Sequence, residues 1–210
     1  MIKYILIEYK YIIVMSDTAS VRVGHCCPNA PNVDVHVDGD IAFEDVPFKQ
    51  ISEYAELSAE SHDISVTPHG DDESVLDLTV ELEADNAYSA FATGMLDGVE
   101  CTVFADDPGD IADDQTHVRF IHTSPDAPAV NVQVADGGPT LCEDISFRDE
   151  SGYVAVDAGT YDLEVVVADS GDVALSLPEV EVTGGTAVSA IAVGQVDDGS
   201  LDAVLADDTQ

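Results

Sequence analysis

An internal repeat constrains the fold of this chain more than any other feature. Residues 21–37 (VRVGHCCPNAPNVDVHV) and residues 118–134 (VRFIHTSPDAPAVNVQV) are identical at nine of seventeen positions without a gap. The similarity continues to the ends of both copies, where residues 103–107 (VFADD) match residues 204–208 (VLADD). A repeat of about 90 residues is longer than solenoid periods and large enough for an independent domain. The sequence therefore predicts two similar units in tandem.

The repeat also suggests boundaries. We place unit 1 at residues 20–107 and unit 2 at residues 117–208, with an acidic linker at 108–116 and an N-terminal extension at 1–19. The extension begins MIKYILIEYKYIIVM, an apolar run broken by Glu8 and Lys10 and too short to span a bilayer. We interpret Met15 as the natural start. A degenerate signal or a membrane-surface anchor is the alternative.

The hydrophobic pattern within each unit predicts β-strands. Val33, Val35 and Val37 alternate with polar residues, and unit 2 repeats this pattern at residues 130–134. Further strands are predicted at 62–68, 75–82 and 87–94, and at 160–168, 173–183 and 186–194. Residues 48–57 have helix-like apolar spacing, but Gly152 in the second copy disfavours a helix. We expect about seven short strands in each unit, as in Greek-key sandwiches.

Charge excludes several classes of partner. The chain carries 43 Asp and Glu residues against 6 Lys and Arg residues, for a net charge of −37. So few cations cannot neutralise the phosphates of nucleic acid or of an anionic membrane. The self-repulsion predicts adaptation to molar salt, where the Debye length falls to about 3 Å. We expect an acidic protein of an extremely halophilic archaeon, with solvent cations at its surface.

The repeated signature Val-Arg-x-x-His-x-x-Pro-Asn/Asp-Ala-Pro-x-Val-Asp/Asn-Val, followed in unit 2 by residues 158–163 (AGTYDL), resembles domain of unknown function family 4397. The resemblance covers nearly all of the chain after Met15. It implies all-β architecture, with two tandem immunoglobulin-like or transthyretin-like antiparallel β-sandwiches. It also implies frequent occurrence on secreted or envelope-associated proteins, without an established activity. Here Cys26 and Cys27 replace the usual small residue and Ser, and no export signal is evident.

Eight positions recur in both units and are candidates for a shared role. They are Arg22, His25, Pro28 and Pro31 in unit 1, and Arg119, His122, Pro125 and Pro128 in unit 2. The histidines could be ligands or bases, but no nucleophile recurs beside both, so we interpret them as tying each turn to its strand. The arginines could bind an anionic ligand, but pairing with a native carboxylate is the favoured interpretation.

Cysteine suggests one alternative site. His25, Cys26, Cys27 and His36 lie close together in sequence and could form a soft-metal or redox site. The spacing differs from Cys-x-x-Cys, and unit 2 replaces Cys26 and Cys27 with Thr123 and Ser124. Buried free thiols or one disulfide are the other interpretations.

The sequence thus predicts a haloadapted, non-catalytic binding or structural module rather than an enzyme. We expect a protein or polymer partner, no cofactor, no nucleic acid and no transmembrane span. The alternative is a metal-binding or redox protein built on the cysteine cluster. The compartment follows from the start site: cytoplasmic if translation begins at Met15, and envelope-associated or secreted otherwise.

Overall fold

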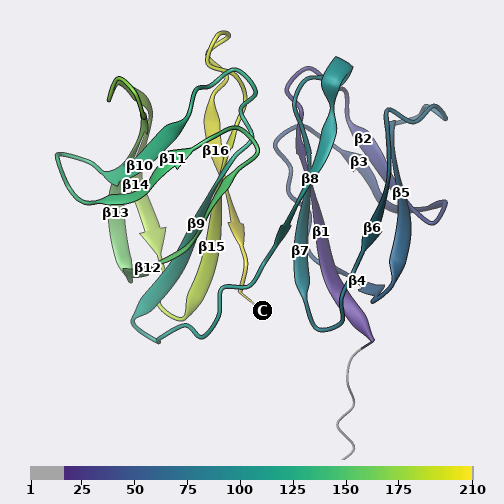
Figure 1. Ribbon diagram of the computed structural model, residues 1–210, viewed down its shortest axis with the longest axis horizontal. Helices are drawn as coiled ribbons and strands as arrows, with labels where there is room; N and C mark the ends of the chain where they lie inside the picture. Colours follow the sequence, from purple (N-terminus) through teal and green to yellow (C-terminus); the bar gives the residue numbers. More distant parts are fainter. Residues whose placement is uncertain (1–16, 210) are drawn as a thin grey trace, which may run out of the picture.

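A computed structural model describes residues 17–209, which form two β-sandwiches (Figure 1). The strands of unit 1 are β1 (Thr18–Cys26), β2 (Val33–Val37), β3 (Asp40–Val46), β4 (Ala55–Ser58), β5 (Ser61–Pro68), β6 (Leu76–Glu81), β7 (Ala87–Thr93) and β8 (Glu100–Ala105), with a short 3₁₀ helix η1 (Leu96–Gly98) before β8. The strands of unit 2 are β9 (Gln115–His122), β10 (Val130–Val134), β11 (Thr140–Ile145), β12 (Glu150–Asp157), β13 (Gly159–Val167), β14 (Val173–Val182), β15 (Thr186–Val193) and β16 (Asp202–Asp207).

The expectation of two tandem all-β sandwiches is confirmed. The described residues contain no α-helix, and therefore none long and apolar enough to cross a membrane. Each unit has eight strands rather than about seven. The ambiguous segment 48–57 ends in the short edge strand β4, and its counterpart in unit 2 is the longer β12.

Each unit consists of two four-stranded sheets. Their orders are β4-β1-β7-β8 and β3-β2-β5-β6 in unit 1, and β12-β9-β15-β16 and β11-β10-β13-β14 in unit 2. The expected antiparallel arrangement needs one correction, because β1 pairs with β7, and β9 with β15, in parallel. A parallel pair requires a long crossover, which the five intervening strands supply.

The strand register corrects one equivalence expected from the sequence. Tyr88 lies opposite Ala105 on β8, whereas the equivalent Val188 lies opposite Asp207 on β16. Asp106 and Asp208 therefore occupy equivalent places, and their amides donate to the carbonyls of Ala87 and Ala187, both at 2.8 Å. The VFADD and VLADD motifs align one residue out of step. Because side chains alternate along a strand, that slip would exchange the two faces of the sheet.

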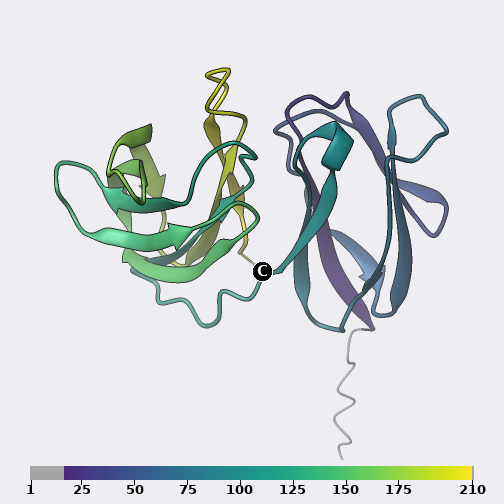
Figure 2. The ribbon, with the colours of Figure 1, turned by 45° about the horizontal axis from the view of Figure 1, so that its top comes forward.

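The sheets that contain β1 and β9 face one another across the middle of the molecule (Figures 1 and 2). On β1, Val21 and Val23 point into the sandwich of unit 1, while Arg22 and Cys26 lie on the opposite face. A separate apolar cluster fills the interior of unit 2, around Phe120, Val132 and Leu163. We call the contact between the β1 and β9 sheets the seam.

Candidate functional site

Arg22 on β1 reaches from unit 1 into unit 2. It is almost fully buried at the seam, at 2% exposure. Its Nε donates to Ser89 Oγ on the neighbouring β7 at 2.8 Å, which aims the guanidinium across the seam. There Nη1 donates to the Asp207 carbonyl at 2.9 Å, and Nη2 forms an ion pair with Asp208.

Arg119 on β9 makes the reciprocal crossing from unit 2 into unit 1. Its Nε donates to Ser189 Oγ at 2.8 Å, and its Nη2 pairs with Asp106 Oδ1 at 2.5 Å. Nη1 donates to the Ala105 carbonyl at 3.1 Å and to Glu150 Oε2 at 3.0 Å. Each recurring arginine is thus paired with the carboxylate that ends the other unit.

Tyrosine and serine hydroxyls donate further hydrogen bonds to both carboxylates. The Tyr54 hydroxyl donates to Asp106 Oδ2 at 2.7 Å, and the Tyr153 hydroxyl donates to Asp208 Oδ2 at 2.7 Å. Each guanidinium also stacks on the tyrosine of its own unit, with a distance of 4.7 Å from Cζ to the ring centroid. We call this set the reciprocal network; it comprises Arg22, Tyr54, Ser89 and Asp106 with Arg119, Tyr153, Ser189 and Asp208.

Burial and the neighbouring carboxylates keep the two tyrosines of the reciprocal network protonated. Desolvation and the adjacent Asp106 carboxylate raise the pKa of Tyr54 above its ordinary value, so the phenol remains a donor. The same causes act on the pKa of Tyr153 beside Asp208. Both aspartate side chains are completely buried, and their charge is matched by the two arginines. The two tyrosine hydroxyls are therefore held as donors to the buried carboxylates.

A second reciprocal pair crosses the seam at Lys49 and Arg148. Lys49 Nζ lies 3.0 Å from Asp202 Oδ2, and Arg148 Nη1 lies 2.8 Å from Glu100 Oε1. Both residues have φ of 72°, a left-handed conformation that is uncommon without glycine. Every lysine and arginine in residues 17–209 therefore bridges the two units, and the other charged positions within that range are acidic or histidine.

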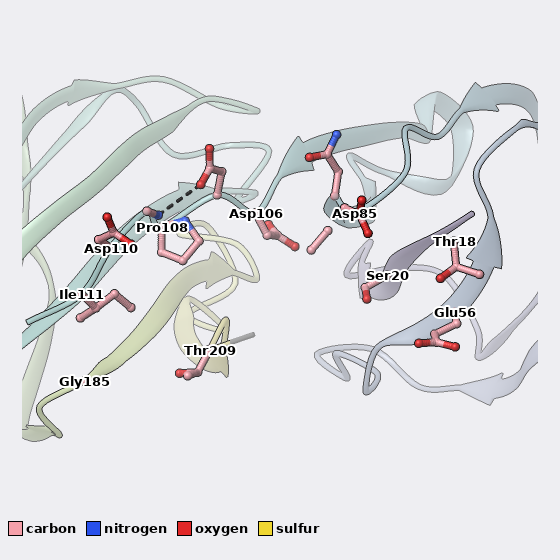
Figure 3. A pocket seen from close by; sticks show the side chains of 14 residues that line it. Thr18, Ser20, Glu56, Asp85, Asp106, Pro108, Asp110, Ile111, Gly185 and Thr209 are labelled. Carbon is pink, nitrogen blue, oxygen red and sulfur yellow. Dashed lines mark hydrogen bonds between the residues drawn. The ribbon is translucent and has the colours of Figure 1, made fainter. Parts of the chain in front are cut away.

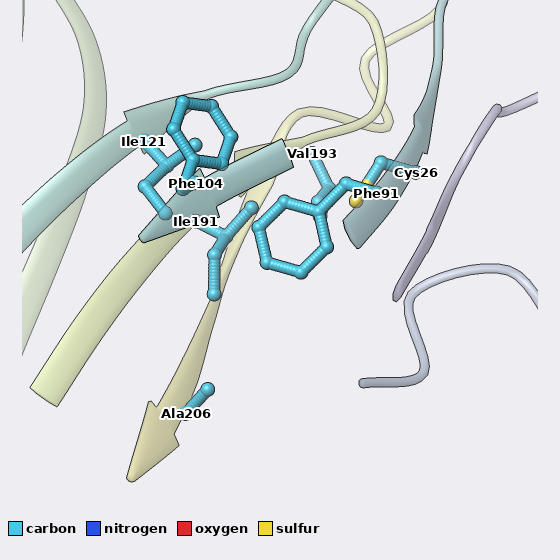
Figure 4. Packing of buried hydrophobic residues seen from close by; sticks show 7 residues of the cluster. All are labelled: Cys26, Phe91, Phe104, Ile121, Ile191, Val193 and Ala206. Atoms are coloured by element: carbon cyan, nitrogen blue, oxygen red, sulfur yellow. The ribbon is translucent and has the colours of Figure 1, made fainter. Parts of the chain in front are cut away.

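An apolar cluster lies beside the reciprocal network. It comprises Cys26, Phe91, Phe104, Ile121, Ile191, Val193 and Ala206, from both units (Figure 4). The rings of Phe91 and Phe104 are tilted, with centroids 5.9 Å apart. The Cys26 thiol lies beside Thr123 of the other unit. The seam thus combines paired charges with a close-packed core.

The recurring histidines each hold the turn that follows them. His25 Nε2 lies 2.9 Å from the Pro31 carbonyl, and His122 Nε2 lies 3.2 Å from the Pro128 carbonyl. Pro28 and Pro125 begin these turns. The next side chain, Asn29 or Asp126, accepts a hydrogen bond from a backbone amide in the loop after β7 or β15. Burial lowers the pKa of both histidines, so the imidazoles are neutral.

A cleft opens at one end of the seam (Figure 3). Its volume is about 610 Å³, and its walls come from the start of β1, the β6–β7 turn, the linker and the end of unit 2. Five of the lining residues are acidic: Glu56, Asp85, Asp106, Asp107 and Asp110. The lining contains no lysine, arginine or histidine, so its potential disfavours anions.

The family profile described as "Domain of unknown function (DUF4397)" matches residues 19–133 and 131–210, which together span nearly the whole chain. The chain belongs to the DUF4397 family. The two matched segments agree with a tandem pair of units. No functionally curated protein matches the chain.

Two solved structures are distantly similar to this DUF4397 protein. The C-terminal domain of AlgF from P. aeruginosa has 17% identity and a TM-score of 0.34, and covers 47% of this chain and 99% of its own. The family 26 carbohydrate-binding module from Eubacterium rectale Amy13K, solved with maltoheptaose, has 11% identity and a TM-score of 0.27. It covers 90% of this chain and 96% of its own.

The four residues of the alternative metal site do not converge. His36 on β2 contacts Thr67 at 3.2 Å, in the outer sheet, whereas Cys26 lies in the seam. Cys27 Sγ lies 3.6 Å from Asn29 Oδ1. Burial raises the pKa of Cys26 to about 12, which disfavours the thiolate that metals bind. Residues 17–209 hold no group of three or more His, Cys, Asp or Glu side chains suited to a metal ion.

Replacing Cys26 and Cys27 by serine should leave the fold of this DUF4397 protein intact in molar salt. Thr123 and Ser124 occupy the equivalent positions in unit 2, and all four cysteines are free thiols. We expect a loss in unfolding free energy on the order of 1 kcal/mol, as for a changed buried hydrogen bond. Circular dichroism measures the outcome, and a double variant without β-sheet signal would contradict the expectation.

Sequence reasoning did not identify most of the DUF4397 seam. It singled out Arg22 and Arg119 but not their carboxylate partners. Tyr54 and Tyr153, and Ser89 and Ser189, also recur at matched positions in the two units. Recurrence of a polar side chain on an otherwise apolar strand was the available signal. The partners could not be assigned from it, because each arginine crosses to the other unit.

A histidine outside the seam makes the stability of unit 1 depend on pH. His62 is 4% exposed, and its Nδ1 lies 2.6 Å from Asp38 Oδ2. This hydrogen bond and a second one to the Ser58 carbonyl raise the pKa of His62. Its stabilising contribution is therefore complete below the ordinary pKa of about 6.5, and is lost as the pH rises through the folded-state value.

We expect His62→Gln to lower the unfolding free energy more at about pH 5.5 than at about pH 8.5. Comparison of variant and wild type at each pH isolates the contribution of His62 to the free energy of unfolding. That comparison is needed because His25 and His122, with lowered pKa values, change stability in the opposite direction. Denaturant titrations give the two differences. Equal losses at both pH values would contradict the assignment.

Proposed function

We propose that this protein is a non-catalytic binding or structural module that presents two β-sandwiches in one fixed orientation to a protein or polymer partner. The reciprocal network carries this proposal. It engages both recurring arginines in contacts between the units, and the recurring histidines are neutral and bonded to their own turns. The recurring arginines and histidines are the best candidates for catalytic residues, and all of them make contacts that hold the fold together.

The proposal includes adaptation to high salt. All the lysines and arginines of residues 17–209 lie at the seam, so within this range the outward faces carry carboxylates without neighbouring lysines or arginines. Such a surface favours hydrated cations and neutral or cationic partners over anionic ones. A place at the cell envelope, in contact with brine, is compatible with this surface, as is a salt-filled cytoplasm.

The test is the intact native mass of the protein, recovered in molar salt from cytosolic and envelope fractions of its own organism, with a thiol titration. We expect the mass of the metal-free chain with four reactive thiols after denaturation. Its distribution between fractions gives the compartment, and its N-terminal mass gives the start residue. A bound metal or a mass deficit from a disulfide would overturn the proposal in favour of the metal-binding or redox alternative.

A further inference from the structure

The polar and apolar parts of the seam differ in symmetry. The reciprocal network uses the same four residue types from each unit, and its arginines and serines lie at equivalent strand positions. A purely polar seam of this kind would fit two copies of either unit equally well, because each contributes one arginine and receives one. The apolar cluster is different, and it decides which faces fit together.

Strand register identifies the apolar equivalents. Gly24 lies opposite Phe91 in unit 1, and Ile121 lies opposite Ile191 in unit 2. Phe104 lies opposite Ser89, and its equivalent opposite Ser189 is Ala206. The face of unit 1 is therefore Gly, Phe and Phe, whereas the face of unit 2 is Ile, Ile and Ala.

Gly24 is required by this arrangement. A Cβ at that position would lie 2.5 Å from Cδ1 of Phe91 and 2.6 Å from Cδ1 of Ile51. Phe91 therefore occupies the space that a side chain on β1 would fill. In unit 2 the equivalent position on β9 carries Ile121, which is itself part of the seam core at 1% exposure.

Charge also distinguishes the two faces. Ile51 bridges to Gly24, and the residue at the same place in unit 2 is Glu150, opposite Ile121. Glu150 accepts a hydrogen bond from Arg119, whereas no carboxylate of unit 1 within residues 17–107 accepts one from Arg22. Counting only the reciprocal network and Glu150, two copies of the unit 2 face would bring six charges together, of which four are carboxylates. Two copies of the unit 1 face would bring four phenylalanines into a core that now holds two.

We propose that the seam is a pairing surface specific for unlike units, and that it accepts the opposite unit of a second copy of this chain. Unit 1 of one chain then pairs with unit 2 of another, through the same reciprocal network, and two such seams close a dimer. The linker favours pairing within one chain, because it holds the units at an effective concentration in the millimolar range. This inference concerns self-assembly and goes beyond the proposed function.

The Cys26 thiol, which lies beside Thr123 across the seam, offers a direct probe. In a Thr123→Cys variant, oxidation with diamide joins Cys26 to the introduced thiol within one chain when the units pair intramolecularly, and between chains when they exchange. Peptide mass mapping distinguishes these bonds from a Cys26 to Cys26 bond, which reports pairing of like units. Wild-type protein, with Cys26 alone at the seam, is the control for random cross-linking.

The variant is refolded in molar salt at about 1 µM and at about 1 mM, below and near the effective concentration. We expect intrachain bonds at the lower concentration. At the higher one, a growing fraction should carry a bond between Cys26 of one chain and the introduced thiol of another. Deleting residues 109–113 should shift this interchain bond to lower concentration. Cys26 to Cys26 bonds in the oxidised dimers would overturn the specificity. Intrachain bonds alone, with both linkers and at both concentrations, would overturn the exchange.

Discussion

Replacing Arg119 by alanine is expected to lower the free energy of unfolding by about 3–5 kcal/mol, the range for breaking a buried ion pair from one side. The arginine is completely buried and serves Asp106 and Asp208, both also completely buried. Its removal leaves carboxylates in the seam without a full complement of donors. Denaturant unfolding in molar salt measures the loss.

Two controls separate this effect from a general loss of charge. Lys49→Ala removes a seam cation that is 31% exposed, and should cost less than about 1 kcal/mol. Arg119→Ala combined with Asp106→Ala should cost less than the sum of the single changes, because the two side chains contact each other. A small loss for Arg119→Ala alone, equal to that of Lys49→Ala, would refute a stabilising role for the reciprocal network.

The melting temperature is expected to fall steeply when the salt concentration drops below about 1 M, because the Debye length grows from about 3 Å toward about 10 Å at 0.1 M. Carboxylates dispersed over the outer faces then repel one another, with a net charge of −37. The buried pairs at the seam are less sensitive to salt, so the loss originates at the surface. Calorimetric melts across a NaCl series provide the measurement.

A charge-reduced variant offers the matched control. Asp40→Asn, Asp72→Asn and Glu73→Gln remove three exposed carboxylates from unit 1. This variant should reach a given melting temperature at lower salt than the wild type. Sucrose at matched osmolality tests for a general effect of solute and should not replace NaCl. A melting temperature independent of salt would overturn the interpretation as a halophilic protein.

The amino-acid sequence alone determined the tandem organisation and the all-β class. Both depend on local information: identity between the two copies, and the alternation of valine with polar residues along strands such as residues 33–37. It also favoured pairing of the recurring Arg22 and Arg119 with native acids, because guanidinium and carboxylate groups form strong charge-assisted hydrogen bonds and the chain is rich in carboxylates. These conclusions require no knowledge of how the units contact each other.

Tertiary structure alone decided which acids those are. The VFADD and VLADD motifs pointed to Asp207 as the equivalent of Asp106, but pairing with β15 places Asp208 there. Hydrogen bonds to the neighbouring strand decide on which face of the sheet each side chain lies, and a one-residue slip moves it to the other face. Sequence identity at a strand end is therefore a weak guide to register.

The crossing of each arginine into the other unit was likewise beyond sequence reasoning. Repeated motifs suggest the same contacts inside each copy, whereas Arg22 and Asp208 meet only when the two sheets pack face to face. Cys26 illustrates the same limit, since its neighbours His25 and Cys27 suggested a metal site, but strand alternation turns its thiol toward Thr123 in the other unit. Contacts between faces depend on how the units pack, and no spacing within one unit encodes that packing.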